Sequence, residues 1–344
     1  MMTLQQRINT FSELGIIMNE AASPAPSSPV AASLRKLMDN QQQHNKWFTP
    51  DNVKMSVTAI AGMLEKERLE IWLEPYRIQD NPEIKKTVAV IMAGNIPLVG
   101  FHDLLCVLIT GNKLLARASI KDTELIRKIA DILDEIDPCF REQVNFTEKI
   151  SGNYDAVIAT GSDNTSRYFE YYFGQKPHLF RKNRNSVAIL SRDTEESDIE
   201  ALAYDIFTYF GLGCRNVSKI YLEKGTNPET IYANWSHWAD ILNHVPYSNN
   251  YLYNKSLFNL NKQMYLDNGF LLLARNESFA SPVSVIFYDF FNSKEELTAE
   301  LSSYSENIQC IVSENHTGFG QTQYPAPDDY ADNMDTIEFI TSLK

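Results

Sequence analysis

The sequence has few cysteines and histidines, and neither residue is arranged as a metal site or a disulfide framework would require. Four cysteines lie dispersed at positions 106, 139, 214 and 310, without a Cys-x-x-Cys pair. The six histidines form no His-Glu-x-x-His pattern. The sequence therefore lacks the signatures of a zinc site and of a disulfide-stapled secreted domain.

Long apolar runs and positive charge are also scarce. No stretch reaches the roughly 18 apolar residues of a membrane span, and the N-terminus lacks a signal-peptide layout, so we expect a cytoplasmic protein without an integral membrane segment. A formal net charge of −13 disfavours nucleic acid as a partner, because phosphate backbones need a basic surface. The Gly-x-Gly-x-x-Gly fingerprint of dinucleotide-binding folds is absent as well.

The first feature along the chain is a helical N-terminal region, which the sequence predicts over residues 1–82. A helix over 3–20 is indicated by apolar residues at helical spacing: Leu4, Ile8, Phe11, Leu14 and Ile17. A Pro/Ser-rich hinge over 21–30 separates it from a second helix over 33–43. Thr49-Pro50 then opens a third helix.

From residue 83 the pattern changes to strands that alternate with helices. Apolar runs predict strands over 87–92, 113–118, 144–150 and 156–159, with helices over 98–109, 123–135 and 163–173. This alternation predicts a doubly wound, Rossmann-type α/β domain over 83–185. A second α/β domain is expected over 186–316, with a Gly/Pro/Asp-rich tail over 317–344 that returns to the active-site region.

Two turns that follow predicted strands could bind phosphate. Ala93-Gly94-Asn95 and Thr160-Gly161-Ser162 each lead into a helix, whose N-terminal N–H groups favour an anion. Each turn is weak evidence alone, because an ordinary strand-to-helix connection has the same composition. Asn95 could equally be the N-cap of a helix that starts at Pro97.

Cys214 lies in a predicted turn between a helix over 197–209 and a strand over 217–222. Gly211 and Gly213 let a substrate approach the backbone, and the charge of Arg215 would favour the reactive thiolate. The alternative is a capped helix end followed by an inert buried thiol.

Three motifs stand in a fixed order along the chain: Gly94-Asn95-Ile96-Pro97, Ala159-Thr160-Gly161-Ser162 and Gly211-Leu212-Gly213-Cys214. This order resembles the aldehyde dehydrogenase superfamily, and within it the LuxC type of fatty acyl-CoA reductase. The segments 45–53 and Ser281-Pro282-Val283 are similar to the same branch. The resemblance implies an aldehyde-dehydrogenase-like fold, with a doubly wound cofactor domain and an α/β catalytic domain, to which the helical N-terminal region adds a cap.

The resemblance also implies roles for individual residues. Cys214 would attack the acyl carbon, while the Asn95 side chain and the Cys214 N–H would form the oxyanion hole. The cofactor would be bound by residues after three strands: Ala93, Gly94, Arg117, Ser119, Thr160, Gly161 and Ser162. An arginine at 117 suits a 2′-phosphate, which favours NADPH and leaves NADH as the alternative.

One departure from the hydrolytic members of the superfamily is informative. They carry a glutamate that activates water, whereas the corresponding segment here, 178–184, has no carboxylate. An S-acyl enzyme without that base would wait for hydride or another thiol. A second glutamate of the family matches Glu277 only with a one-residue shift, so its role stays open.

These observations favour an NAD(P)H-dependent acyl-CoA reductase, with CoA as part of the thioester substrate and as a product. Two alternatives remain: a CoA-acylating aldehyde dehydrogenase that works oxidatively, or an acyl-carrying subunit of a fatty acid reductase complex with weak cofactor use. The expected partners are acyl-CoA or an acyl-protein, an acyl-protein synthetase subunit in the complex, and further copies of the chain as a homo-oligomer.

Overall fold

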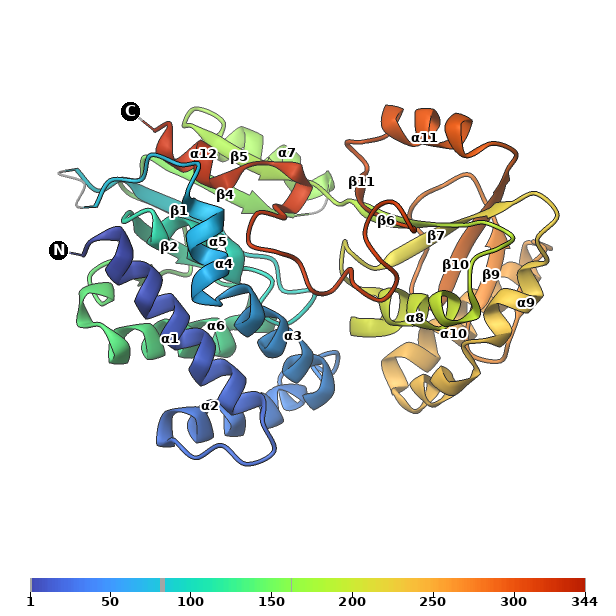
Figure 1. Ribbon diagram of the computed structural model, residues 1–344, viewed down its shortest axis with the longest axis horizontal. Helices are drawn as coiled ribbons and strands as arrows, with labels where there is room; N and C mark the ends of the chain where they lie inside the picture. The colour runs from blue at the N-terminus through green and yellow to red at the C-terminus, as the bar shows by residue number, and fades with distance from the viewer. Residues whose placement is uncertain (1, 81–83, 162, 344) are drawn as a thin grey trace. The chain divides into compact units, whose positions relative to one another are not determined.

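The computed structural model describes residues 2–80, 84–161 and 163–343, and its contacts divide the chain into two units (Figure 1). Unit 1 consists of Met1–Asn183 together with Tyr324–Lys344, and unit 2 is Arg184–Gln323. The four segments expected from the sequence are thus grouped differently. The helical region, the first α/β domain and most of the tail share unit 1.

Four helices open unit 1, and their N-termini are set by local side chains. Their bounds are α1 (Leu4–Ala22), α2 (Pro29–Asn40), α3 (Pro50–Met63) and α4 (Lys66–Leu73). Thr3 and Gln6 form a capping box at α1. The Thr49 side chain accepts from the Asn52 N–H at the start of α3, with Pro50 in the first turn. The helices indicated by the sequence are confirmed, with shifted ends.

The sheet of unit 1 has five strands in the order β3-β2-β1-β4-β5, and every neighbouring pair is parallel. The strands are β1 (Thr87–Ile91), β2 (Lys113–Arg117), β3 (Val144–Phe146), β4 (Ala156–Thr160) and β5 (His178–Arg181). In register, Ile91 pairs with Arg117 on one side and with Ala159 on the other. The carboxyl ends of β1, β2 and β4 therefore meet at one edge.

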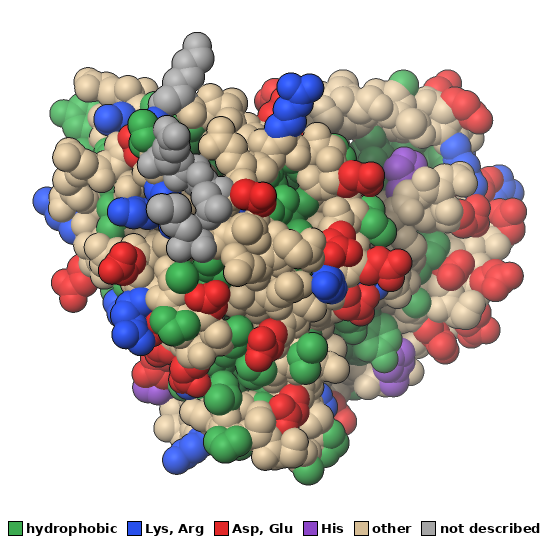
Figure 2. Space-filling model, turned by 60° about the vertical axis from the view of Figure 1, so that its left-hand side comes forward, with side chains coloured by type: hydrophobic (Ala, Val, Ile, Leu, Met, Phe, Trp, Pro, Cys, Tyr) green, Lys and Arg blue, Asp and Glu red, His purple; other side chains and the backbone are tan. Residues whose placement is uncertain are grey.

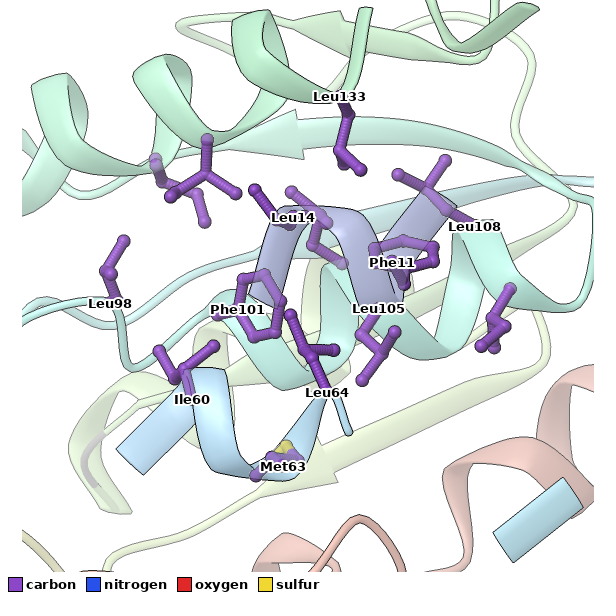
Figure 3. Packing of buried hydrophobic residues seen from close by; sticks show 14 of the residues in the cluster. Phe11, Leu14, Ile60, Met63, Leu64, Leu98, Phe101, Leu105, Leu108 and Leu133 are labelled. Carbon is purple, nitrogen blue, oxygen red and sulfur yellow. The ribbon is translucent and has the colours of Figure 1, made fainter. Parts of the chain in front are cut away.

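Both faces of this sheet are covered, as the apolar strand sequences predicted. Val88 and Val90 point to a core formed with the N-terminal helices, α5 (Phe101–Ile109) and α6 (Thr123–Ile136), part of which is shown in Figure 3. Ala89 and Ile91 point to the opposite face, against α7 (Asp163–Phe173). Alternate residues of one strand thus enter different cores, because successive side chains of a strand point to opposite faces.

The connection after β1 differs from the prediction. The helix begins at Phe101 with Gly100 as its N-cap, so Pro97 precedes it and Asn95 is not the cap. Leu98 takes a left-handed conformation, with φ 56°, and its side chain joins the core of Figure 3. Its N–H donates to Asp122 Oδ2 at 2.7 Å. Burial of Leu98 and this bond hold a turn that helical periodicity did not predict.

Arg181 forms a buried ion pair and also holds the C-terminal helix within unit 1. Arg181, at the end of β5, donates to both oxygens of Asp103 on α5, at 2.6 and 2.7 Å. Its second terminal nitrogen donates to Thr336 Oγ1 at 2.7 Å, at the start of α12 (Thr336–Thr341). The sequence analysis did not predict α12.

Unit 2 is a second α/β layer structure. Its six strands run in the order β11-β6-β7-β10-β9-β8, and only β8 with β9 is an antiparallel pair. The strands are β6 (Asn185–Leu190), β7 (Val217–Glu223), β8 (Leu266–Asp267), β9 (Leu272–Arg275), β10 (Val285–Phe291) and β11 (Ile308–Val312). The helices are α8 (Glu196–Phe207), α9 (Pro228–Ala233), α10 (Val245–Leu260) and α11 (Lys294–Ser303).

The cores of unit 2 follow the same rule as those of unit 1. Ala188 and Leu190 of β6 pack with α8, and Val187 of the same strand packs with α11. Unit 2 is thus also a sheet buried on both faces.

The face shown in Figure 2 bears mixed charge. On the face shown in Figure 2, lysine and arginine side chains are scattered among acidic and uncharged ones. Across the described ranges, no helix is long and apolar enough to span a membrane.

Breaking the pairing of Arg181 with Asp103 should strongly destabilise unit 1. We expect Asp103→Ala to lower the free energy of unfolding by about 3–5 kcal/mol, because it leaves a buried guanidinium unpaired. Urea unfolding followed by circular dichroism measures this change. Asp39→Ala breaks the exposed pair with Arg35 and should cost at most about 1 kcal/mol. Equal losses in the two variants would contradict this assignment.

Asp122 should make stability depend on pH. Burial raises the pKa of its carboxyl from 3.8 to about 8, although the Leu98 N–H opposes the shift. Between these values the folded chain keeps a proton that the unfolded chain has lost, so stability falls as pH rises, by up to about 1.4 kcal/mol per unit. Asp122→Asn should flatten this slope in urea titrations at pH 5 to 8. Parallel slopes for variant and parent would rule the effect out.

Candidate active site

Cys214 lies in the turn between α8 and β7, as predicted, and the structure shows how the turn is built. Helix α8 ends at Phe207, and a short 3-10 turn follows over Thr208–Gly211. Tyr209, Phe210 and Gly211 all have positive φ, at 53°, 58° and 75°. Left-handed backbone is costly for residues with a Cβ, so other contacts must hold this segment.

Two polar side chains provide such contacts. Asn216 binds the end of α8 with its amide nitrogen and accepts from the Gly213 N–H with its amide oxygen, at 2.8 Å. Ser186, fully buried on β6, donates its hydroxyl to the Cys214 carbonyl at 2.9 Å. The sequence analysis assigned neither residue a role. The only signal available was the position of Asn216, two residues after the cysteine.

The thiol of Cys214 is half-buried and not part of a disulfide. The neighbouring guanidinium of Arg215 donates to the sulfur of Cys310 on β11, at 3.3 Å. The sequence analysis expected Arg215 to favour the Cys214 thiolate. In the structure its guanidinium donates to the sulfur of Cys310.

β7 also fixes the loop that contains Glu277. Lys219 donates its ammonium to the Glu277 carbonyl at 2.8 Å, and the Ser218 hydroxyl donates to the Phe279 carbonyl at 2.7 Å. Burial lowers the pKa of Lys219. The strand that follows Cys214 therefore positions the segment leading to Ser281-Pro282-Val283.

The predicted cofactor residues of unit 1 cluster at the carboxyl edge of its sheet. Gly94 lies against Ser119, because a Cβ on Gly94 would come within 2.6 Å of the Ser119 Cβ. Asn95 is exposed in the same turn. Ala93, the residue before Gly94, is half-buried. The loops after β1 and β2 thus touch at a point where only glycine fits.

A hollow of about 650 Å³ opens beside this edge. Ile91 and Arg117 line it from the strand ends, and the far wall is aromatic, with Tyr154, Tyr168, Phe169, Tyr172 and Phe173. Arg117 itself is exposed. The hollow therefore combines aromatic rings with the strand-end cation Arg117 and the neighbouring charges of Glu148 and Lys149. Its volume lies within the range of small-molecule sites.

The turn after β4 packs against Phe169, one of the residues that line this hollow. Thr160 is the last residue of β4, and the Gly161 N–H donates to the Arg181 carbonyl at 3.3 Å. A Cβ on Gly161 would lie 2.9 Å from the Phe169 ring, so glycine lets α7 come close. Ser162 lies outside the described residues. Asn95 belongs to unit 1 and Cys214 to unit 2, so their shared oxyanion hole stays a prediction.

β5 offers no carboxylate of its own, in keeping with the sequence. Phe180 packs against Phe169 and stacks on His178, while Arg181 is committed to Asp103. One carboxylate does reach the end of β5 from the tail, where Asp332 accepts from the Lys182 N–H at 3.0 Å. This contact could not be found by scanning the segment 178–184.

Comparisons with known proteins agree with this architecture. A family model described as acyl-CoA reductase (LuxC) matches residues 79–234. No curated protein matches the chain. Solved structures of similar fold include an NADP dependent enzyme from E. coli, with 12% identity, a TM-score of 0.65 and coverage of 90% of this chain and 73% of that one.

Two aldehyde dehydrogenases have the same fold. The enzyme from Bacillus cereus in an NAD+ complex has 13% identity and a TM-score of 0.59, covering 91% of this chain and 76% of its own. The NAD-dependent enzyme from Sinorhizobium meliloti has 11% identity and a TM-score of 0.65, covering 93% and 76%. The fold expected from the resemblance is confirmed. Residues 79–234 match the acyl-CoA reductase (LuxC) family model, and the chain is an oxidoreductase of acyl or aldehyde groups with an aldehyde-dehydrogenase fold.

Proposed function

We propose that the chain reduces an acyl thioester, presented as acyl-CoA or acyl-protein, to the aldehyde through an acyl group held on Cys214. The observation that carries this proposal is the cysteine turn, where buried side chains fix the backbone on both sides of a half-buried thiol. In a reductase of acyl groups, a thiol fixed in this way is best explained as the acyl acceptor.

In the proposed reaction, the Cys214 thiolate forms a bond to the thioester carbon and the carbonyl oxygen becomes an oxyanion. The Cys214 N–H and the Asn95 amide would donate to that oxygen, a contribution that is typically worth about 10²–10³ in rate per donor. The C–S bond to CoA then breaks, and CoA leaves as the thiolate. Bound NADPH would supply the hydride that gives the aldehyde and restores the cysteine.

Persistence of the acyl group would follow from the resemblance, which aligns the segment 178–184 with the one that carries the hydrolytic glutamate. An S-acyl cysteine is hydrolysed when a carboxylate activates water beside it. In this segment Phe180 packs inward and Arg181 is held in an ion pair, and none of the β5 side chains is a carboxylate. Asp332, the carboxylate at this strand end, already accepts a backbone N–H. We therefore expect reduction to outrun hydrolysis.

The hollow of unit 1 supports a nucleotide as the second ligand. Its aromatic wall suits stacking with a base, and Arg117 supplies positive charge for a phosphate. A 2′-phosphate is the group that distinguishes NADPH from NADH, so this cation favours NADPH. Among the similar folds, one is an NADP dependent enzyme and another an NAD+ complex.

Acylation of Cys214 can be measured directly. Protein incubated with acyl-CoA in the absence of NADPH should gain one acyl mass, and Cys214→Ser should gain none. Cys139→Ser removes an exposed thiol of unit 1 and serves as the matched control, with the adduct retained. An adduct of the same mass on Cys214→Ser would overturn the proposal. Oxidation of NADPH with acyl-CoAs of varied length separates a reductase from an acyl-carrying subunit.

The cofactor preference should change with Arg117. Arg117→Ala should raise KM for NADPH about tenfold more than KM for NADH, equivalent to about 1.4 kcal/mol of phosphate binding. Lys113→Ala removes an exposed cation from the opposite end of the same strand and should leave both constants unchanged. Equal effects of Arg117→Ala on the two cofactors would place the 2′-phosphate elsewhere.

A further inference from the structure

The cysteine turn follows a helix end that needs compensation. The last carbonyls of an α-helix have no partner within the helix, and they carry partial negative charge. At α8 the chain then enters three left-handed residues in succession, of which Tyr209 and Phe210 have a Cβ. A left-handed backbone is unfavourable for each residue with a Cβ. Both features lie a few residues before Cys214.

The side chain of Asn216 answers both needs at once. Its nitrogen donates to the Asp205 carbonyl at 3.0 Å and to the Thr208 carbonyl at 2.8 Å, so both of its N–H groups are used on the end of α8. Its oxygen accepts from the Gly213 N–H at 2.8 Å. The residue is 3% exposed. A flipped amide would set its oxygen against two carbonyls, so this orientation alone is satisfied.

These contacts bracket the cysteine. Asn216 fixes the peptide N–H of Gly213, on the N-terminal side of Cys214, and Ser186 fixes the Cys214 carbonyl on the other side. Ser186 also accepts from the Cys310 N–H at 3.1 Å, so its hydroxyl is itself held by β11. The position of the thiol is thus set by one amide and one hydroxyl, both buried.

We propose that Asn216 is a positioning residue that holds the Cys214 thiol in its reactive place by tying the cysteine turn to the end of α8. Because its N–H groups cover the helix carbonyls, it also weakens the negative field that would otherwise disfavour a thiolate nearby. Asn216 touches no reacting atom in this role. The inference rests on the proposed function, in which Cys214 carries the acyl group.

The decisive variant is Asn216→Asp, which keeps the shape and the acceptor for Gly213. Its second oxygen faces the carbonyls of Asp205 and Thr208, so the carboxylate repels them, whereas the protonated acid can donate to one of them. We expect Cys214 alkylation by iodoacetamide to fall about tenfold to a hundredfold near pH 8, as a displacement of about 1 Å can cost. The rate, corrected for thiolate fraction, should recover as the pH is lowered.

Other titratable groups near the turn require the parent protein as a baseline. Asp205 lies on α8 and accepts from Gly320 and Thr322, and burial raises the pKa of its carboxyl despite those bonds. Arg215 contacts the Cys310 thiol. These groups are the same in parent and variant, so the ratio of their rates at each pH isolates residue 216.

Asn268→Asp is the matched control, because the Asn268 oxygen likewise accepts backbone N–H groups, from Phe270 and Leu271, in another turn of unit 2. It should lower Tm without changing Cys214 alkylation. Ser186→Ala removes the hydrogen bond to the Cys214 carbonyl, and it should slow alkylation of Cys214 about tenfold. Peptide mapping in a Cys139→Ser background assigns the label to Cys214.

The outcomes separate the inference from the proposed function. Slow alkylation of a folded Asn216→Asp protein, with recovery at low pH and unchanged KM for acyl-CoA, supports the inference. Parent-like alkylation at every pH, in that variant and in Ser186→Ala, overturns it. If acyl-CoA never labels the parent Cys214 while iodoacetamide does, the proposed function fails and the alkylation test still decides the role of Asn216.

Discussion

Parallel pairing of the strands is the constraint on which the rest of unit 1 depends. Because β1, β2 and β4 run in the same direction and in register, their last residues reach one edge of the sheet. Ile91 and Arg117 end up paired there, and the glycines of the following turns let the loops and α7 pack closely. The nucleotide site proposed at this edge would need no dinucleotide fingerprint, since strand direction gathers its parts.

Unit 2 meets a different requirement, which is to hold an irregular turn rigidly. A cysteine between a helix end and a strand start is surrounded by backbone groups that regular structure does not pair. Asn216 and Ser186 pair several of them from buried positions. The same region holds residues 320–322 through Asp205, so buried polar side chains organise the segments around α8. Apolar packing alone could not specify such a geometry, because it is not directional.

The two halves of the proposed chemistry are consistent with each other. The proposed thioester intermediate persists only where water is not activated. On β5, Phe180 is taken up by packing and Arg181 by its ion pair with Asp103. The same arginine also holds α12, because it donates a hydrogen bond to Thr336 at the start of that helix. The segment that the resemblance aligns with the hydrolytic glutamate and the attachment of the tail thus involve the same strand.

The sequence by itself determined most of the strands and helices and the place of Cys214, because periodicity and glycine-containing turns are local signals. It did not predict the short strands β5 and β8 or the helix α12. It also pointed to the family, through motifs whose order is read along the chain. Local signals failed at the connection after β1, where burial of Leu98 and its bond to Asp122 override a helix start at Pro97. Only the tertiary structure brought Asp332 to Lys182 and Asn216 to the end of α8. Contacts of this kind depend on how the elements pack. The identity of a side chain that accepts or donates a hydrogen bond does not indicate which distant residue will be its partner.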